Sequence, residues 1–280
     1  MTDSMLQDSP TAPEPRLQPI PPVPVTTEDT GLSPGLIADL IMKALYSLGA
    51  RTGDELRAFV RLPFAILDEQ LVDLQKRRLV EVREGGQSRV TYSFDLTSEG
   101  RNRARESMDT NGYVGPAPVP LHLYRKVTEA QSVHKSAVTR DNVRSSFTDD
   151  VIEPGLLDRI GASVNSGRAI FLYGDAGTGK TYISQRLTRL FPGLVLFPHA
   201  VAIDNQVVQV FDPLMHKVVD VSHSDDAVML GRGHDRRFAV CERPAVITAG
   251  ELSADMLEVT YEPTAKLYEA PLQMKANNGV

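Results

Sequence analysis

The chain has very little cysteine: Cys241 is the single one among 280 residues, so no internal disulfide can form. This is typical of proteins in a reducing compartment. No second cysteine and no closely spaced pair of histidines accompanies Cys241, so we expect no metal site there. We interpret Cys241 as a small buried thiol.

The sequence also lacks long apolar runs and an N-terminal signal pattern, so we expect a soluble, cytoplasmic protein without membrane contact. Positive charge is not in excess. The net charge of −6 argues against a general role in coating nucleic acid and leaves only a local basic face open. The 41% hydrophobic and 24% charged residues are typical of a globular protein, and the length allows about two domains and a tail.

The most informative stretch is AIFLYGDAGTGKT, residues 169–181, which contains the pattern G-x-x-x-x-G-K-[ST]. In this pattern the chain wraps around an anion between a buried strand and the N-terminus of a helix. Gly177 and Gly179 allow the backbone to come close to phosphate oxygens, where a Cβ would clash. The residues predicted to bind the nucleotide are Gly174, Asp175, Ala176, Gly177, Thr178, Gly179, Lys180, Thr181 and Tyr182.

Two side chains in this stretch are expected to act directly on the phosphates. Lys180 should reach the β- and γ-phosphates, which makes it the predicted catalytic residue, and the Thr181 hydroxyl should hold Mg²⁺. The flanks fit the pattern. The apolar run 169–173 predicts a strand, and an apolar stripe from Ile183 to Leu190 predicts a helix that ends at 191–193. The motif therefore predicts that the protein binds a nucleoside triphosphate.

Residues 1–30 form a proline-dense tail with PEPRLQPIPPVPV at its centre. Such a segment cannot bury enough surface to fold, so we expect it to be disordered, extended and mobile. A ligand for a proline-reading domain is an alternative that we favour less.

Residues 31–110 predict a compact first domain. An apolar stripe over Leu36–Leu48 indicates a first helix, Thr52 with Glu55 forms the capping box of a second, and Pro63 opens a third. Strands are expected at 79–82 and 90–94, followed by a polar helix from 97 to about 108. This order resembles a winged helix, and LVEVREGGQSRVTYSFDLTSEGRNRA resembles the wing and final helix of bacterial winged-helix domains.

DNA binding by this domain is not the favoured interpretation. Across 33–109, twelve lysines and arginines are balanced by twelve aspartates and glutamates. The third helix carries Asp68, Glu69 and Asp73 where base contacts normally form. We therefore expect a protein-docking or regulatory module, and a DNA-binding regulator stays open as the alternative.

Residues 111–136 are expected to form an extended linker, and 137–280 the nucleotide domain. His216, His223 and His234 match no metal-site spacing and are interpreted as solvated loop histidines. Arg232, Arg236 and Arg237 are interpreted as a solvated basic turn, although an arginine there could reach a neighbouring subunit's phosphate. The strands expected after the motif are 194–197, a hairpin of 201–203 with 207–211, then 244–248 and 256–261.

ATP hydrolysis needs a strand that ends in acidic residues to hold Mg²⁺ and polarise water. The one internal segment with an apolar run before an acid is Val207–Asp212, where Pro213 stands in place of a second carboxylate. LYEAPLQMKANNGV, residues 267–280, instead resembles the segment just before this strand (Walker B) in AAA+ families such as the bacterial enhancer-binding activators and the magnesium chelatase and MoxR-like ATPases.

Residues 31–280 as a whole resemble a bacterial AAA+ ATPase with an N-terminal winged-helix domain. The resemblance implies an α/β fold of the P-loop NTPase type, with a parallel sheet flanked by helices, ATP and Mg²⁺ as ligands, a homo-oligomeric ring and remodelling of a protein or nucleic-acid partner. By this resemblance Val151 and Ile152 contact adenine, although packing of a helix start would explain them equally. We expect the chain to be the N-terminal piece of a longer ATPase, with Walker B, sensor and arginine-finger residues beyond Val280.

A third class of function stays open, a P-loop kinase acting on a small molecule. Such kinases close a lid that carries several arginines over the phosphates. The sequence has one arginine cluster that could form such a lid, namely Arg232, Arg236 and Arg237.

Overall fold

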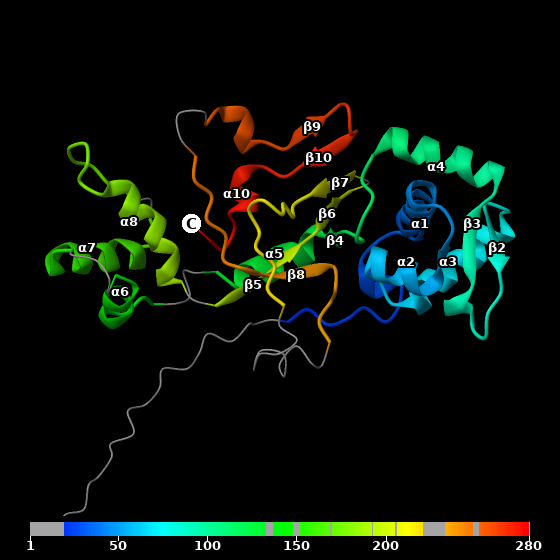
Figure 1. The fold of residues 1–280 in the computed structure, drawn as a ribbon, viewed down its shortest axis with the longest axis horizontal. Coiled ribbons are helices and arrows are strands. Elements are labelled where there is room, and N and C mark those ends of the chain that lie inside the picture. The colour runs from blue at the N-terminus through cyan, green and yellow to red at the C-terminus, as the bar shows by residue number, and fades with distance from the viewer. Residues whose placement is uncertain are drawn as a thin grey trace, which may run out of the picture.

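A computed structural model describes residues 20–132, 137–147, 152–168, 170–191, 193–204, 206–220, 233–248 and 252–279. The elements fall into three groups along the long axis of the molecule (Figure 1). The first group, at one end, consists of helices around a small sheet. The middle group contains the other two sheets, and the third group, at the opposite end, is helical. Within the described residues, no helix is both long and apolar enough to cross a membrane.

The first group contains the expected helices and strands in the expected order, with one further strand, β1, that the sequence did not predict. It consists of α1 (Pro34–Leu48), β1 (Arg51–Thr52), α2 (Gly53–Val60), α3 (Phe64–Lys76), β2 (Val80–Glu84), the 3-10 turn η2 (Arg89–Thr91), β3 (Ser93–Leu96) and α4 (Ser98–Thr110). The strands form an antiparallel sheet in the order β1-β3-β2. The predicted strand 90–94 thus begins later than expected, because its first residues form the turn η2.

Local capping explains where these helices begin. The Ser33 hydroxyl accepts a hydrogen bond from the Leu36 N–H at the start of α1, and Thr52 forms the predicted capping box with Glu55 at the start of α2. Each cap satisfies N–H groups that have no partner within the helix. The apolar stripes then meet in one core, where Ile41 of α1 and Leu67 of α3 are fully buried. Burial of each such side chain contributes about 1.5–3 kcal/mol.

The middle group contains two sheets. A mixed sheet has the order β4-β6-β7-β10-β9, and β5 pairs with β8 in an antiparallel ribbon. The hairpin predicted from 201–211 is confirmed as β6–β7. The elements are β4 (Val119–Pro120), α5 (Leu121–Ala130), β5 (Leu194–Pro198), β6 (Ala200–Ile203), β7 (Gln206–Gln209), β8 (Phe238–Glu242), the 3-10 helix η5 (Ala254–Leu257), β9 (Thr260–Glu262), β10 (Leu267–Glu269) and α10 (Leu272–Lys275).

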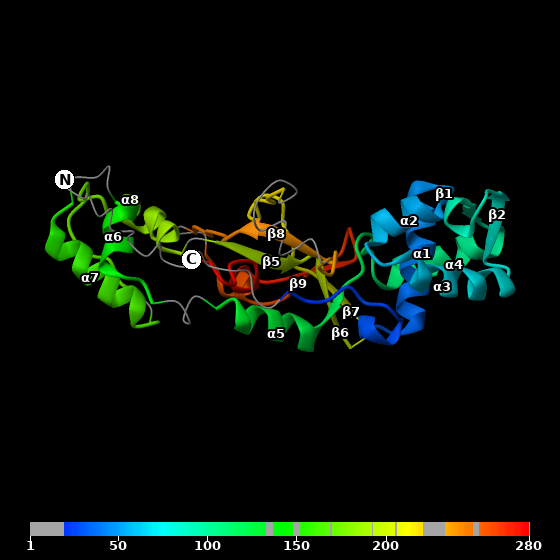
Figure 2. The same ribbon diagram turned by 90° about the horizontal axis from the view of Figure 1, so that it is seen from below.

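Three predictions about this region were wrong. The expected linker 111–136 carries β4 and α5, and Figure 2 shows α5 lying along one face of the central strands. Tyr124 and Val127 of α5 are buried there, because its apolar side chains pack against the strands. The expected strand 244–248 forms no regular element, and the strand expected over 256–261 is replaced by η5 followed by β9.

The proline-rich segment that precedes α1 is packed onto the body. Among residues 20–30, Pro21, Pro24, Thr27 and Thr30 are buried, at every third position. The buried positions therefore lie on one face of the segment, which is turned toward the body. The prediction of a free tail is therefore wrong for 20–30, which ends in the 3-10 turn η1 (Glu28–Thr30), and residues 1–19 lie outside the described part.

The third group is helical. Its elements are α6 (Arg140–Ser146), α7 (Pro154–Asn165), α8 (Lys180–Arg186) and the 3-10 turn η4 (Leu187–Leu190). They share a small apolar core that includes Phe147, Ile160 and Ile183. The protein is thus α/β with mixed and antiparallel sheets, and no described strand belongs to the helical group. The expected parallel sheet around the glycine-rich motif is not found among the described residues.

Candidate functional site

The glycine-rich loop before α8 has an unusual backbone. Gly174, Gly177 and Gly179 have φ values of 146°, 81° and 82°, in the region that residues with a Cβ rarely adopt. A Cβ added at Gly177 or Gly179 would meet nothing within 4 Å. Glycine is therefore required there by the turn of the chain, and the space beside both residues is open.

Lys180 lies inside this loop. Its Nζ donates hydrogen bonds to the carbonyls of Gly174 (3.0 Å) and Asp175 (2.6 Å), and the Thr178 hydroxyl also donates to Asp175 O (2.8 Å). Gly179 precedes the first residue of α8, and its carbonyl accepts the Ile183 N–H (2.9 Å). The loop thus curls around a positive charge at the start of a helix, and all of residues 174–179 are exposed.

The strand expected before this loop is absent. Residues 170–173 have no regular structure, Phe171 and Tyr173 are 85% and 84% exposed, and their rings stack with centroids 6.0 Å apart. The prediction of a buried strand was wrong for this segment because no described strand lies beside it to accept its backbone hydrogen bonds. Ile170 and Leu172 instead line an apolar groove of about 380 Å³ formed with α7 and α8.

The other residues predicted to contact nucleotide or Mg²⁺ are Thr181, Tyr182, Val151 and Ile152. Thr181 and Tyr182 are exposed on the first turn of α8, and the Tyr182 ring lies under the Arg186 guanidinium, 3.7 Å from its carbon. Ile152 packs against the apolar core of the helical group, which is the structural role considered for it, and Val151 lies outside the described residues. No group of three or more histidine, cysteine or acidic side chains that could hold a metal occurs in the described part of the chain.

Asp212, which follows the apolar run of β7, lies elsewhere. Its carboxylate accepts a hydrogen bond from Lys275 Nζ (3.1 Å), and its N–H donates to His216 Nδ1 (2.9 Å). Partial burial acts to raise the pKa of Asp212, but hydrogen bonds from the Leu214 N–H and from Lys275 outweigh it and lower the pKa. Figure 1 shows β7 well apart from α8, so the structure does not bring Asp212 to the loop.

The sequence predicted that His216 is a solvated loop histidine, and this prediction was wrong. Its side chain is 2% exposed and packs against Phe197, with ring centroids 4.1 Å apart. Because Nδ1 accepts a hydrogen bond from Asp212 N, Nε2 carries the proton and donates to the Lys275 carbonyl (2.8 Å). His234 is half-buried, and burial lowers the pKa of both histidines. His223 lies outside the described residues.

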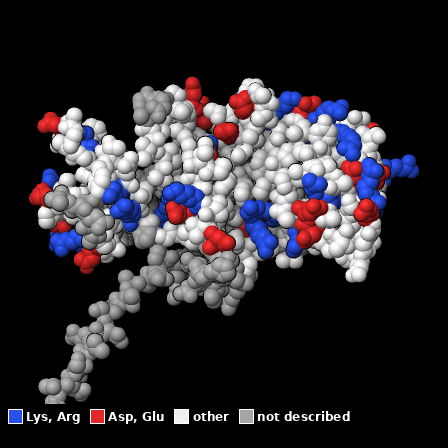
Figure 3. All heavy atoms as spheres, in the orientation of Figure 1, with Lys and Arg blue, Asp and Glu red and all other residues white. Residues whose placement is uncertain are grey.

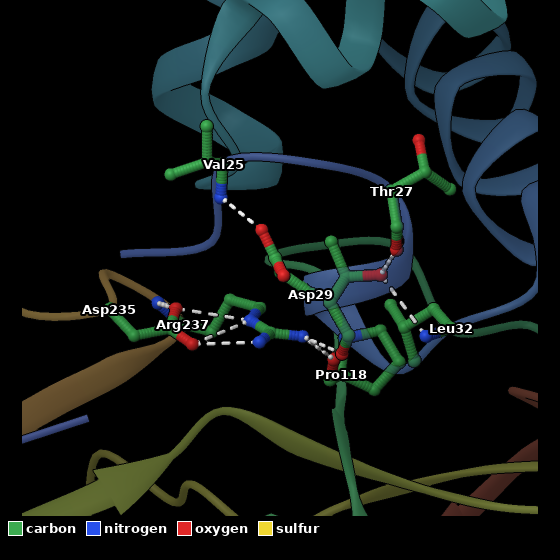
Figure 4. Close-up of polar contacts among 8 residues, drawn as sticks. Val25, Thr27, Asp29, Leu32, Pro118, Asp235 and Arg237 are labelled. Atoms are coloured by element: carbon green, nitrogen blue, oxygen red, sulfur yellow. Dashed lines mark hydrogen bonds and ion pairs between the residues drawn. The ribbon is translucent and has the colours of Figure 1, made fainter. Parts of the chain in front are cut away.

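Arg237 is also buried, at 1% exposure, so the predicted solvated basic turn is wrong at this position. Its guanidinium forms an ion pair with Asp235 (2.7 Å), and its Nη1 donates to the carbonyls of Thr30 (2.8 Å) and Pro118 (3.0 Å). Figure 4 shows these contacts next to the turn in which the Asp29 carboxylate accepts the Val25 N–H. Arg237 is therefore unable to close over a bound phosphate, and Arg232 lies outside the described residues.

No local pattern distinguishes buried Arg237 from exposed Arg236, so sequence reasoning missed this cluster. Asp235 is a neighbour in the chain, but the two carbonyls that accept from Arg237 lie 119 and 207 residues away. The same holds for His216, whose Nε2 partner is 59 residues away. The Cys241 prediction is confirmed: the thiol is fully buried, and burial raises its pKa to about 12.

Ion pairs occupy many of the arginines of the first group. Arg89 pairs with Asp68 (2.6 Å), and Asp95 accepts from both Arg83 (2.9 Å) and Arg101 (3.0 Å). Arg77 pairs with Asp73 on α3 (3.3 Å). Figure 3 shows basic and acidic side chains mixed over this end of the molecule.

Comparisons with known proteins found no family model, no curated protein and no solved structure that matches this chain.

Proposed function

We propose that the loop Gly174–Thr181 binds the triphosphate of ATP together with Mg²⁺. The observation that carries the proposal is the position of the Lys180 ammonium. It is held inside a turn of three positive-φ glycines at the start of a helix. Lys180 is half-buried beside an exposed loop backbone. A phosphate is typically bound by backbone N–H groups, a helix N-terminus and a cation, and this loop supplies all three.

The residues around the loop fit this role. Among the described residues, Lys180 bonds only to carbonyl and hydroxyl oxygens of the loop itself, so these bonds can be exchanged for phosphate oxygens without breaking an ion pair. Thr181 follows it on the exposed first turn of α8, where a hydroxyl can ligate Mg²⁺. Bound Mg²⁺ would neutralise phosphate charge, while Lys180 and the loop backbone orient the phosphates.

The proposal extends to an ATPase of the AAA+ type that remodels a protein partner, with residues 31–110 as a winged-helix domain. The order of α1–α4 and the antiparallel β1-β3-β2 sheet support the second part. The ion-paired arginines of this domain favour a protein-docking module over a DNA reader. The Asp212 carboxylate, which follows β7, pairs with Lys275 of α10 (3.1 Å), so we derive no hydrolytic step from Asp212.

Titration with a fluorescent ATP analogue tests the proposal. Lys180→Ala is expected to weaken binding by about a hundredfold, because one charge-assisted phosphate contact contributes about 1.5–3 kcal/mol. The matched control is Lys217→Ala, whose side chain is 81% exposed and outside the helical group. Equal affinities of the two variants would remove the basis of the proposal, and chelation of Mg²⁺ is expected to weaken binding by the unsubstituted chain.

A further inference from the structure

The strand β9 forms an open edge of the mixed sheet. It lies last in the order β4-β6-β7-β10-β9, and β10 is its one strand partner among the described residues. The Ala270 N–H donates to Gln209 of β7 (2.8 Å), so the backbone groups of Glu269 face the other way, toward Thr260 of β9. Because successive residues alternate, the N–H and C=O of Tyr261 point away from the sheet.

The side chains of this edge alternate in character. The strand itself is Thr260–Glu262, and the backbone of Glu258 before it is also extended. Strand alternation over the sequence E-V-T-Y-E then predicts Val259 and Tyr261 on one face and Glu258, Thr260 and Glu262 on the other. Val259 and Tyr261 are each 45% exposed, and the Tyr261 ring packs on Tyr268 of β10 with centroids 4.9 Å apart. Residues 258–262 contain neither lysine nor proline, which commonly protect an open edge from pairing.

The residues around β9 add further exposed apolar surface and further negative charge. Residues 252–265 are all exposed, and Leu252, Met256 and Leu257 add apolar surface next to the strand. Asp255, Glu258 and Glu262 form no ion pair within the described residues, so their charge is available to a ligand. Figure 3 shows acidic side chains gathered over η5 and the β9–β10 hairpin, above the centre of the molecule.

We propose that β9 is a docking site for an extended segment of a partner protein in which basic and apolar residues alternate. The segment would add a strand beside β9, through the outward backbone groups of Tyr261. Its apolar side chains would pack beside Val259 and Tyr261, and its basic side chains would lie beside Glu258 and Glu262. We choose a basic segment because its positive charge complements the negative charge of Glu258 and Glu262. A second copy pairing antiparallel about Thr260 would place Glu258 opposite Glu262, which is unfavourable.

Fluorescence anisotropy with two labelled peptides tests the proposal, using the whole chain without nucleotide so that the result is independent of ATP binding. One peptide alternates valine with lysine and the other valine with glutamate. The valine–lysine peptide is expected to bind, and added salt is expected to weaken it. In Glu258→Lys/Glu262→Lys, affinity for this peptide is expected to fall by about tenfold and the valine–glutamate peptide to bind instead, since two cross-strand charge pairs change sign.

The control Glu84→Lys/Glu106→Lys changes the net charge by the same amount on the exposed surface of the first group, and it is expected to bind like the unsubstituted chain. Tyr261→Pro removes the outward N–H and is expected to abolish binding of either peptide. Circular dichroism checks that each variant is folded. Binding that does not distinguish the two peptides, or that the control changes as much as the β9 variant, would overturn the proposal. So would sedimentation showing a dimer that Tyr261→Pro dissociates.

Discussion

Arg237 donates a hydrogen bond to the carbonyl of Thr30 across 2.8 Å, although 207 residues separate them in the chain. The same guanidinium pairs with Asp235 and bonds Pro118, so one buried side chain joins the segment before α1, the segment before β4 and the loop before β8. The Asp235 N–H adds a further bond to Pro21 (2.9 Å). The packing of residues 20–30 onto the body therefore depends on an ion pair that is almost wholly removed from solvent.

Substitution of Arg237 is expected to be severe. Arg237→Ala leaves Asp235 buried without its cation and two carbonyls without a donor, which costs about 3–5 kcal/mol in the free energy of unfolding. Urea denaturation measures this, with exposed Arg236→Ala as the control. The double variant Asp235→Ala/Arg237→Ala is expected to lose less than the sum of the two single variants, because no unpaired charge is left. A loss below about 1 kcal/mol for Arg237→Ala would contradict the role given to the pair.

Stability is expected to fall on mild acidification because of His199. Its Nε2 is buried without a hydrogen-bond partner among the described residues, and its ring packs on Phe211 with centroids 4.8 Å apart. Burial, together with the charge of Arg61 and His216, lowers its pKa to about 4. The folded state thus keeps His199 neutral while the unfolded chain takes up a proton near pH 6.5. The stabilisation is complete above about pH 6.5 and is lost as the pH falls toward 4.

Between about pH 7 and pH 5 this histidine is expected to remove about 2 kcal/mol from the free energy of unfolding. His216 and His234, whose pKa values are also lowered, act in the same direction. His199→Phe keeps an aromatic ring against Phe211 and cannot be protonated. Thermal denaturation of this variant at both pH values should show a smaller pH dependence than the unsubstituted chain, and an unchanged dependence would show that His199 does not titrate as stated.

The backbone of the loop is expected to matter for nucleotide binding more than for folding. At Gly179 the φ of 82° disfavours any side chain, while the space beside it is open. Gly179→Ala is therefore expected to shift the loop at a strain of about 1 kcal/mol and to weaken ATP binding by about tenfold. Because residues 174–179 are exposed, the thermal midpoint should change little. Gly35→Ala, at an exposed helical glycine with no atom near an added Cβ, is the matched control.

Cys241 is expected to be unreactive in the folded protein. It is fully buried within β8, and burial raises its pKa to about 12, so almost no thiolate forms at neutral pH. Since the thiolate is the reactive species, modification by an aromatic disulfide reagent should be at least about a hundredfold slower in buffer than in guanidinium chloride. Rapid and complete labelling of the native chain would contradict the burial of β8.

The sequence by itself determined the features that depend on near neighbours in the chain. The capping box of Thr52 and Glu55, the apolar stripes of α1 and α3, and the β6–β7 hairpin each rely on partners within a few residues. The need for glycine at 177 and 179 is local in the same way. Tertiary structure decided the rest. Whether residues 170–173 become a strand depends on a neighbouring strand, and the burial of His216 and Arg237 depends on acceptors 59 to 207 residues away. Local periodicity carries no information about such distant partners, because they are brought together only when the whole chain packs.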